Sequence, residues 1–293
     1  MKNLISKISY RLRNYWSKSK LNNEVAAAAS SQKVLGLQYK LLYQSKSPPL
    51  KFKDVGLRVH SQHEEDGILL FIFALIGSTN KRCVEICAGD GIECNTANLI
   101  INHRWIGLLC DGSPRNIKKA QAFYKYNKDT QFWPPKIIQE WLTKDNINDI
   151  LERNGFKGEI DLLSLDVDGV DYWLWKELAS VSPRVVVLEI NHLWGPDASK
   201  TVPYRDDFVA EYTQFGSDYA GASLSAFIKL GRDKGYRLVG TNAIATNAFF
   251  VRNDIAHDWL PEVEAASCFD HPRAQFGMSH RLPGIKDKAW LEV

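Results

Sequence analysis

The sequence has little cysteine, and the spacing of what it has excludes two kinds of site. Its 293 residues include five cysteines, and no two stand in the C-x2-C spacing of a zinc site. An odd number gives no closed disulfide framework, which is typical of a reducing compartment. We therefore expect the cysteines to be small buried thiols on core strands.

Long apolar runs and a secretory signal are also missing. The longest apolar run, Ile68–Ile76, is too short to cross a bilayer and predicts a buried helix. The basic N-terminus is not followed by the apolar core of a signal peptide. We therefore expect a cytoplasmic protein.

Positive charge is scarce outside the N-terminus. The first twenty residues carry six Lys and Arg and no acid, whereas the remaining chain has 31 basic and 34 acidic residues. A slightly acidic body argues against a nucleic-acid partner. Residues 1–20 also place apolar side chains at helical spacing, which predicts a basic amphipathic helix.

This helix has two interpretations. It either touches the inner face of the cell membrane peripherally or packs on the rest of the chain. Because Ser47-Pro48-Pro49 breaks the pattern, we place the helix and a linker in residues 1–46 and the main domain in residues 47–293. The sequence leaves the oligomeric state open.

Strand-like and helix-like segments alternate from about residue 60. Apolar strand-like runs are Arg82–Ala88, Trp105–Asp111, Pro135–Trp141, Ile160–Asp166 and Arg184–Asn191. Helical patterns are Asn95–His103, Ser113–Tyr124, Asn146–Asn154, Asp171–Val181 and Ala222–Gly235. Fully apolar strands separated by helices predict a doubly wound α/β fold with a parallel sheet. Two further runs, Tyr236–Gly240 and Ala248–Arg252, predict a terminal antiparallel hairpin.

The turn after the first strand is the candidate cofactor site, because ligands of such sheets bind beyond the carboxyl ends of the strands. Gly89 and Gly91 permit a tight turn and a close approach by a ligand. Asp111 ends the next strand and can accept hydrogen bonds from both hydroxyls of a ribose. Asn95 or Thr96 can cap the following helix.

Charge distinguishes two cofactor classes for this turn. A dinucleotide site needs G-x-G-x-x-G, but Cys94 replaces the third glycine, and Asp90 and Glu93 place negative charge where a pyrophosphate would lie. A cationic sulfonium with an α-amino group is attracted by carboxylates such as Glu85, Asp90 and Glu65. The turn therefore favours S-adenosylmethionine over NAD(P).

At these residues the chain resembles the class I S-adenosylmethionine-dependent methyltransferases, in particular the FkbM-like family. The resemblance covers about residues 60–254. The segments that carry it are Ser61–Gly67, Val84–Leu99, Gly107–Ser113, Ile160–Asp171, Gly221–Leu224 and Asn247–Arg252.

The resemblance implies a Rossmann-like, seven-stranded sheet whose last strand is antiparallel. It also implies a cofactor held by Glu85, Gly89, Gly91 and Asp111, with Gly112 beside them. Glu140 and Trp141, after the third strand, would flank the adenine. Cys87 stands where the family has its first glycine, and because cysteine is small we expect the turn to keep its shape.

The ends of the fourth and fifth strands offer two devices for activating an acceptor hydroxyl. His192 is a candidate general base, oriented by Asp166 or Asp168. Alternatively, Asp168, Glu189 and Asn191 would hold a divalent cation, Mg²⁺ or Mn²⁺, which lowers the pKa of the hydroxyl. The plainer interpretations are that His192 is an ordinary loop residue and that Asp166 supports the cofactor.

Two smaller features complete the expected cleft. Asp171 is predicted to be the N-cap of the helix that follows the fourth strand. A long loop follows the fifth strand, and its aromatic residues either stack on sugar faces or pack a lid. These residues are Trp194, Tyr204, Tyr212, Phe215 and Tyr219.

The leading hypothesis is an O-methyltransferase that acts on a sugar hydroxyl during synthesis of a surface polysaccharide or glycolipid. The sugar rests mainly on the resemblance, and the acceptor is a small molecule or a glycan. The alternatives are an NAD(P)-dependent oxidoreductase on the same fold and a non-catalytic module that binds a membrane surface.

Overall fold

The computed structural model describes residues 29–45, 50–214 and 216–293. The chain divides into two compact units, Met1–Ser47 and Pro48–Val293. In the first unit, residues 29–44 form one helix, and the helix predicted for residues 1–20 lies outside the described residues. The second unit contains all the strands described below.

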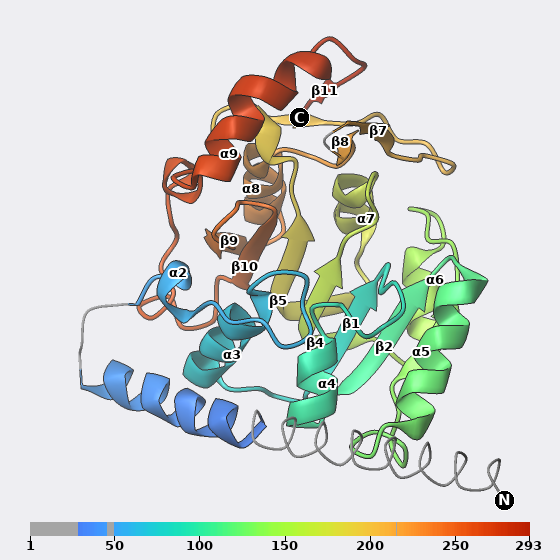
Figure 1. The fold of residues 1–293 in the computed structure, drawn as a ribbon, viewed down its shortest axis with the longest axis vertical. Coiled ribbons are helices and arrows are strands. Elements are labelled where there is room, and N and C mark those ends of the chain that lie inside the picture. The colour runs from blue at the N-terminus through green and yellow to red at the C-terminus, as the bar shows by residue number, and fades with distance from the viewer. Residues whose placement is uncertain (1–28, 46–49, 215) are drawn as a thin grey trace, which may run out of the picture. The chain divides into compact units, whose positions relative to one another are not determined.

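The second unit is built on a seven-stranded sheet in the order β3-β2-β1-β4-β5-β10-β9 (Figure 1). The strands are β1 (Arg82–Ile86), β2 (Ile106–Asp111), β3 (Lys136–Gln139), β4 (Gly158–Leu165), β5 (Val181–Glu189), β9 (Tyr236–Thr241) and β10 (Asn247–Arg252). The pairs from β3 to β5 are parallel, and β10 is antiparallel to both β5 and β9. The predicted doubly wound sheet with a terminal antiparallel hairpin is confirmed.

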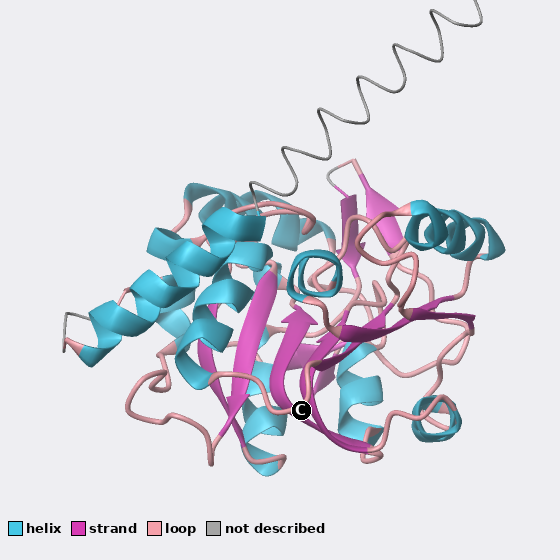
Figure 2. Ribbon diagram, turned by 90° about the horizontal axis from the view of Figure 1, so that it is seen from below, coloured by secondary structure: helices cyan, strands magenta, loops and turns pink. Residues whose placement is uncertain are grey.

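Helices of this unit cover both faces of the sheet (Figure 2). They are α2 (Phe52–Val55), α3 (Glu65–Ile76), α4 (Ala97–His103), α5 (Pro114–Tyr126), α6 (Ile147–Arg153), α7 (Asp171–Glu177), α8 (Leu224–Asp233) and α9 (Pro272–Phe276). The apolar run Ile68–Ile76 lies in α3 and is mostly buried, as predicted. Among the described residues, none of the helices has the length and apolarity of a bilayer-spanning segment.

The segments between β5 and the C-terminus add short elements over the carboxyl ends of the strands. They are η1 (His192–Trp194), β6 (Lys200–Thr201), the hairpin of β7 (Glu211–Thr213) and β8 (Gly216–Tyr219), η2 (Ala265–Cys268), η3 (Gly277–Arg281), η4 (Leu282–Gly284) and β11 (Leu291–Glu292). β11 pairs with β6, so the end of the chain is tied to the loop that follows β5.

Two predicted boundaries at α7 are wrong. The helix predicted for Asp171–Val181 ends at Glu177, because Leu178 is extended and Val181 already begins β5. Asp171 is also not the N-cap: Val170 holds that position, and Asp171 is the first helical residue. Its buried carboxylate instead accepts hydrogen bonds from the backbone N–H groups of Val167 and Gly169 and so shapes the loop after β4.

Candidate cofactor and reaction site

The turn after β1 has the tight shape that its glycines predict. Gly89 and Gly91 have φ values of 56° and 69°, in the left-handed region. Cys87 also lies there, with φ 63°, so this cysteine adopts the conformation that a glycine takes most easily. Cys87 is exposed and the other four cysteines are buried, but only Cys83 and Cys110 lie on core strands, so the prediction of buried strand thiols holds for those two.

Replacing Gly91 should destabilise the fold more than replacing a glycine that also has a positive φ but has open space where a Cβ would lie. A Cβ on Gly91 would lie 3.1 Å from Ala120 Cβ and 3.3 Å from a ring carbon of Tyr124, whereas a Cβ on Gly235, with φ 82°, would meet nothing within 4 Å. We expect Gly91→Ala to lower the free energy of unfolding by about 2–4 kcal/mol. Gly235→Ala should cost about 1–2 kcal/mol, from the backbone alone. Urea denaturation measures both, and equal losses would contradict the packing argument.

Asp111 connects the end of β2 to this turn. One carboxylate oxygen accepts a hydrogen bond from the backbone N–H of Gly89 at 2.9 Å. The other accepts from the backbone N–H of Ser113 at 2.8 Å and the side-chain amide of Asn116 at 3.2 Å. All these donors are uncharged, so no cation among them lies against this acidic side chain at the cavity that it lines.

Glu85 is placed differently from a ligand of the cofactor's amino group. It is buried, and it accepts hydrogen bonds from Thr96 N at 2.7 Å, Asn95 N at 3.4 Å and Ser164 Oγ at 2.8 Å. Asn95 also donates its side-chain amide to Ser164. Burial raises the pKa of Glu85 to about 7. Glu85 and Asn95 therefore tie β1, β4 and the start of α4 together behind the turn.

The acids within the turn are paired with cations. Asp90 lies 3.7 Å from the Lys119 ammonium, and Glu93 lies 2.9 Å from the Arg58 guanidinium. The negative charge that the sequence placed in the turn is thus partly balanced. The predicted preference for a cationic ligand therefore depends on the cavity beside the turn rather than on the turn itself.

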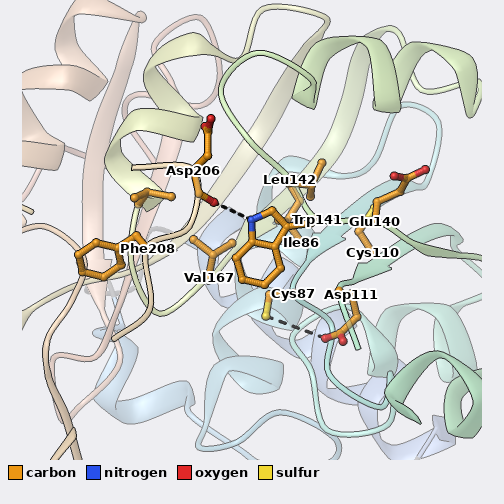
Figure 3. Close-up of a pocket in the computed structure, with 12 residues that line it drawn as sticks. Ile86, Cys87, Cys110, Asp111, Glu140, Trp141, Leu142, Val167, Asp206 and Phe208 are labelled. Atoms are coloured by element: carbon orange, nitrogen blue, oxygen red, sulfur yellow. Dashed lines mark hydrogen bonds between the residues drawn. The ribbon is translucent and has the colours of Figure 1, made fainter. Parts of the chain in front are cut away.

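That cavity lies where the strand order reverses, beyond the carboxyl ends of β1 to β4 (Figure 3). Its empty volume is about 490 Å³, part of it open to solvent. Its lining residues are Ile86, Cys87, Cys110, Asp111, Gly112, Glu140, Trp141, Leu142, Val167, Val170, Asp206 and Phe208. Three of them are acidic, and none is Lys or Arg. A larger cavity, with an empty volume of about 1540 Å³, lies beside β9 and contains none of the predicted residues.

Trp141 covers one side of the cavity (Figure 3). Its indole N–H donates to the backbone carbonyl of Asp206 at 2.7 Å. A Cβ on Gly112 would lie 3.0 Å from the indole ring, so a side chain at this position would push against the ring. Glu140 lines the same cavity and forms an ion pair with Arg153. The structure therefore brings Asp111, Gly112, Glu140 and Trp141 together, as the sequence predicted.

The apolar residues that line this cavity were not predicted from the sequence. Val167 and Val170 follow β4, Leu142 follows Trp141, and Phe208 comes from the long loop after β5. The signal for the first three was their position just beyond predicted strands. Nothing in the sequence indicated that Phe208 folds back across the cavity.

Three carboxylates gather at the ends of β4 and β5. Asp166, Asp168 and Glu189 each offer an oxygen, and these oxygens all lie within 4.8 Å of one another. Burial, together with the charge of Asp168, raises the pKa of Asp166 to about 6. Burial and the charge of Asp166 hold the pKa of Glu189 well above its usual range. A cation or a shared proton would relieve this repulsion.

A buried amide lies beside this carboxylate cluster. Asn247 pairs in register with Glu189, and its side-chain nitrogen donates to Glu65 at 2.9 Å. Its side-chain oxygen is buried and has no hydrogen-bond partner among the described residues. The charge of Glu65 also raises the pKa of Asp166, so Glu65 adds negative charge to the same place.

Asn191 is not placed as a metal ligand. Its side-chain nitrogen donates to the backbone carbonyls of Asp218 and Ala220, both at 2.9 Å, and its side-chain oxygen accepts from Leu193 N. These bonds anchor the strand β8 to the start of η1. Among the described residues, the carboxylates that lie close together are Asp166, Asp168 and Glu189, rather than the predicted set of Asp168, Glu189 and Asn191.

His192 is not oriented by Asp166 or Asp168. It is buried against η3, where a Cβ on Gly277 would lie 2.9 Å from its Nε2, and that nitrogen has no hydrogen-bond partner among the described residues. Burial first, and then the charges of Arg281 and Arg273, lower the pKa of His192 to about 4. Such an imidazole is a weak base at neutral pH.

The aromatic residues of the long loop mostly pack on one another. Trp194 and Tyr219 both contact Trp290 edge to face, and Tyr204 packs on Trp173. Tyr212 is exposed, and the charge of Asp168 raises its pKa, which places it near the carboxylates. Phe215 lies outside the described residues. Lid packing therefore accounts for Trp194, Tyr204 and Tyr219.

Solved structures that resemble this fold include several methyltransferases. A magnesium protoporphyrin IX methyltransferase of Synechocystis PCC 6803 with bound SAM is 14% identical over 58% of this chain and 69% of that chain, with a TM-score of 0.37. An S-adenosylmethionine-dependent methyltransferase of Clostridium acetobutylicum is 12% identical over 75% and 98%, with a TM-score of 0.41. The methyltransferase domain of bacterial CtHen1-C is 11% identical over 64% and 97%, with a TM-score of 0.42. No protein-family model and no curated protein matches the sequence.

Proposed function

We propose that the protein is an S-adenosylmethionine-dependent O-methyltransferase. The observation that carries this proposal is the cavity at the reversal of strand order, which is lined by apolar and acidic residues and by no basic residue. A pyrophosphate needs cations or free backbone N–H groups, and this lining offers no cation. A sulfonium ligand with a neutral adenosine suits it.

Each wall of the cavity suits one part of that cofactor. Asp111 would accept the two ribose hydroxyls at the end of β2. The indole of Trp141 and the side chains of Leu142 and Val167 would hold the adenine between apolar surfaces. The open turn at Gly89, where a Cβ would meet nothing within 4 Å, leaves room for the methionine part.

For the acceptor we propose a sugar hydroxyl of a surface polysaccharide or glycolipid. Support comes from the resemblance of the sequence to the FkbM-like family and from the carboxylate cluster, since a hydroxyl attacks a sulfonium only after losing its proton. The exposed ring of Tyr212 near Asp168 would contact a sugar face. The proton would pass to the cluster of Asp166, Asp168 and Glu189 rather than to His192.

A divalent cation fits the same cluster. Three carboxylate oxygens within 4.8 Å of one another form a hard, oxygen-only ligand set of the kind that Mg²⁺ and Mn²⁺ prefer. When bound, such an ion would lower the pKa of the acceptor hydroxyl. Asp166, Asp168 and Glu189 would hold it, and Asn247 would support Glu65 behind them.

Calorimetric titration tests the cofactor. We expect S-adenosylhomocysteine to bind one site per chain, and NADH and NADPH to bind at least about a hundredfold more weakly, because the lining has no cation for their phosphates. Gly112→Val should abolish binding by pushing into the indole of Trp141, whereas Gly284→Val, where a Cβ meets nothing, should leave it unchanged.

The same titration distinguishes the alternatives. Tight NAD(P)H binding would establish an oxidoreductase instead, and no nucleoside binding at all would leave only a non-catalytic module.

A further inference from the structure

The loop between α5 and β3 shows large aromatic side chains to solvent. Tyr126, Phe132 and Trp133 are 76%, 87% and 76% exposed. Ile106, at the start of β2 and 42% exposed, belongs to the same region, because its strand pairs with β3 two residues later. We name Tyr126 and residues 127–135 the aromatic loop. It lies at the lower end of α5 in Figure 1, at the opposite ends of the strands from the cofactor cavity.

Hydrogen bonds hold the aromatic loop in one shape. The backbone N–H groups of Thr130 and Gln131 donate to Asn127 O, and that of Trp133 donates to Thr130 O, at 2.8–3.2 Å. The buried Thr130 hydroxyl donates to Tyr124 O at 3.0 Å. The exposed aromatics thus stand on a fixed turn. Phe and Trp are seldom left in water together, and a cluster of them marks a contact surface.

The loop and its two ends carry more basic than acidic residues. Residues 125–138 contain three lysines, Lys125, Lys128 and Lys136, and one acid, Asp129, in a body that otherwise has more acidic than basic residues. The partner of this surface therefore carries negative charge.

We propose that the aromatic loop docks the protein on an anionic lipid bilayer. Trp, Tyr and Phe with adjacent lysines are the residues that enter the headgroup region of such a surface. A second copy of this surface has the same sign of charge. The apolar edge of Ile106 and Pro134 suits acyl chains better than it suits nucleic-acid bases.

Vesicle co-sedimentation of the full chain tests the docking. We expect partitioning onto vesicles of phosphatidylcholine with a quarter phosphatidylglycerol and much weaker partitioning onto pure phosphatidylcholine. Phe132→Ser combined with Trp133→Ser should weaken the partitioning by about tenfold or more. The control is Phe276→Ser, an aromatic residue that is 45% exposed on α9, and it should leave partitioning unchanged.

Charge reversal tests the basic rim. Lys125→Glu combined with Lys128→Glu should weaken partitioning onto the anionic vesicles by about tenfold or more, and Lys53→Glu on α2 should not. S-adenosylhomocysteine binding, which uses the other ends of the strands, should stay the same in every variant and so reports correct folding.

Three results would overturn the proposal. One is equal partitioning of the serine double variant and the wild type. Another is a loss of self-association in light scattering without a change on vesicles, which would assign the loop to a second copy. The last is loss of binding to a single-stranded oligonucleotide with unchanged vesicle partitioning, which would assign it to nucleic acid.

Discussion

Asp111→Asn should raise the dissociation constant for S-adenosylhomocysteine by about a hundredfold. The carboxylate is positioned at the end of β2 by Gly89, Ser113 and Asn116, all of which donate to it. Two hydroxyl hydrogen bonds to a charged acceptor contribute about 1.5 kcal/mol or more each, and about 3 kcal/mol is a hundredfold in affinity. An amide at this position offers one acceptor oxygen and turns an N–H₂ group toward one of the present donors.

Calorimetric titration of the variant measures this effect, with Asp129→Asn as the control. Asp129 is an exposed acid of the aromatic loop, so its amide should leave the affinity unchanged. Thermal unfolding of Asp111→Asn shows whether the turn still folds. A folded variant with wild-type affinity would remove Asp111 from the cofactor site.

Asp168→Asn should lower kcat by about a thousandfold while the affinity for S-adenosylhomocysteine stays within about threefold. The loss has the size expected for removal of a group that takes or masks a proton in the transition state. The affinity is preserved because Asp168 does not line the cofactor cavity. Asp207→Asn, an exposed acid of the long loop, is the control.

Methyl transfer from radiolabelled cofactor to a glycan acceptor gives kcat for both variants. Equal losses of kcat and of cofactor affinity in Asp168→Asn would indicate a structural role. Full activity would move proton removal to another group, with His192 as the next candidate.

The same carboxylates should determine two properties of turnover: its fall at low pH and its response to removal of a divalent cation. Without a cation the pKa of Asp166 is raised to about 6, so protons compete with the cation for the cluster below that pH. Turnover should therefore fall as the pH is lowered through about 6, rather than near 4 as for an ordinary carboxyl. EDTA should abolish turnover, and Mg²⁺ or Mn²⁺ should restore it. Turnover that is indifferent to EDTA would leave proton transfer to the carboxylates alone.

The sheet could be predicted because its signals are local. Buried strands such as β5 are continuous apolar runs, and the turns between elements carry glycine, proline or a capping serine. The end of α7 was mispredicted for a reason that is not local. The segment after Glu177 has an apolar pattern that suits a helix, but β5 needs Val181 as the partner of Gly158 on β4. Pairing with a distant strand therefore overrides the helical pattern.

The candidate site could be predicted as far as strand ends determine it. Asp111, Asp166, Asp168 and Glu189 end or directly follow strands, and the carboxyl ends of parallel strands meet at one edge. Asn191 and His192 lie only a few residues further, but there the chain turns into η1 and takes both side chains under β8 and η3. Phe208 arrives from a loop whose path no periodicity describes.

The hydrogen bond from the Trp141 indole to the Asp206 carbonyl bears on how fast the proposed cofactor would enter and leave the cavity. It joins the segment after β3 to the long loop at the cavity, while Glu85 holds β1, β4 and the start of α4 together behind the turn through Thr96 and Ser164. Under the proposed function, spent cofactor would therefore leave on the side where a single neutral hydrogen bond joins these two segments. Departure of the demethylated cofactor, rather than transfer of the methyl group, would then set the upper limit on turnover.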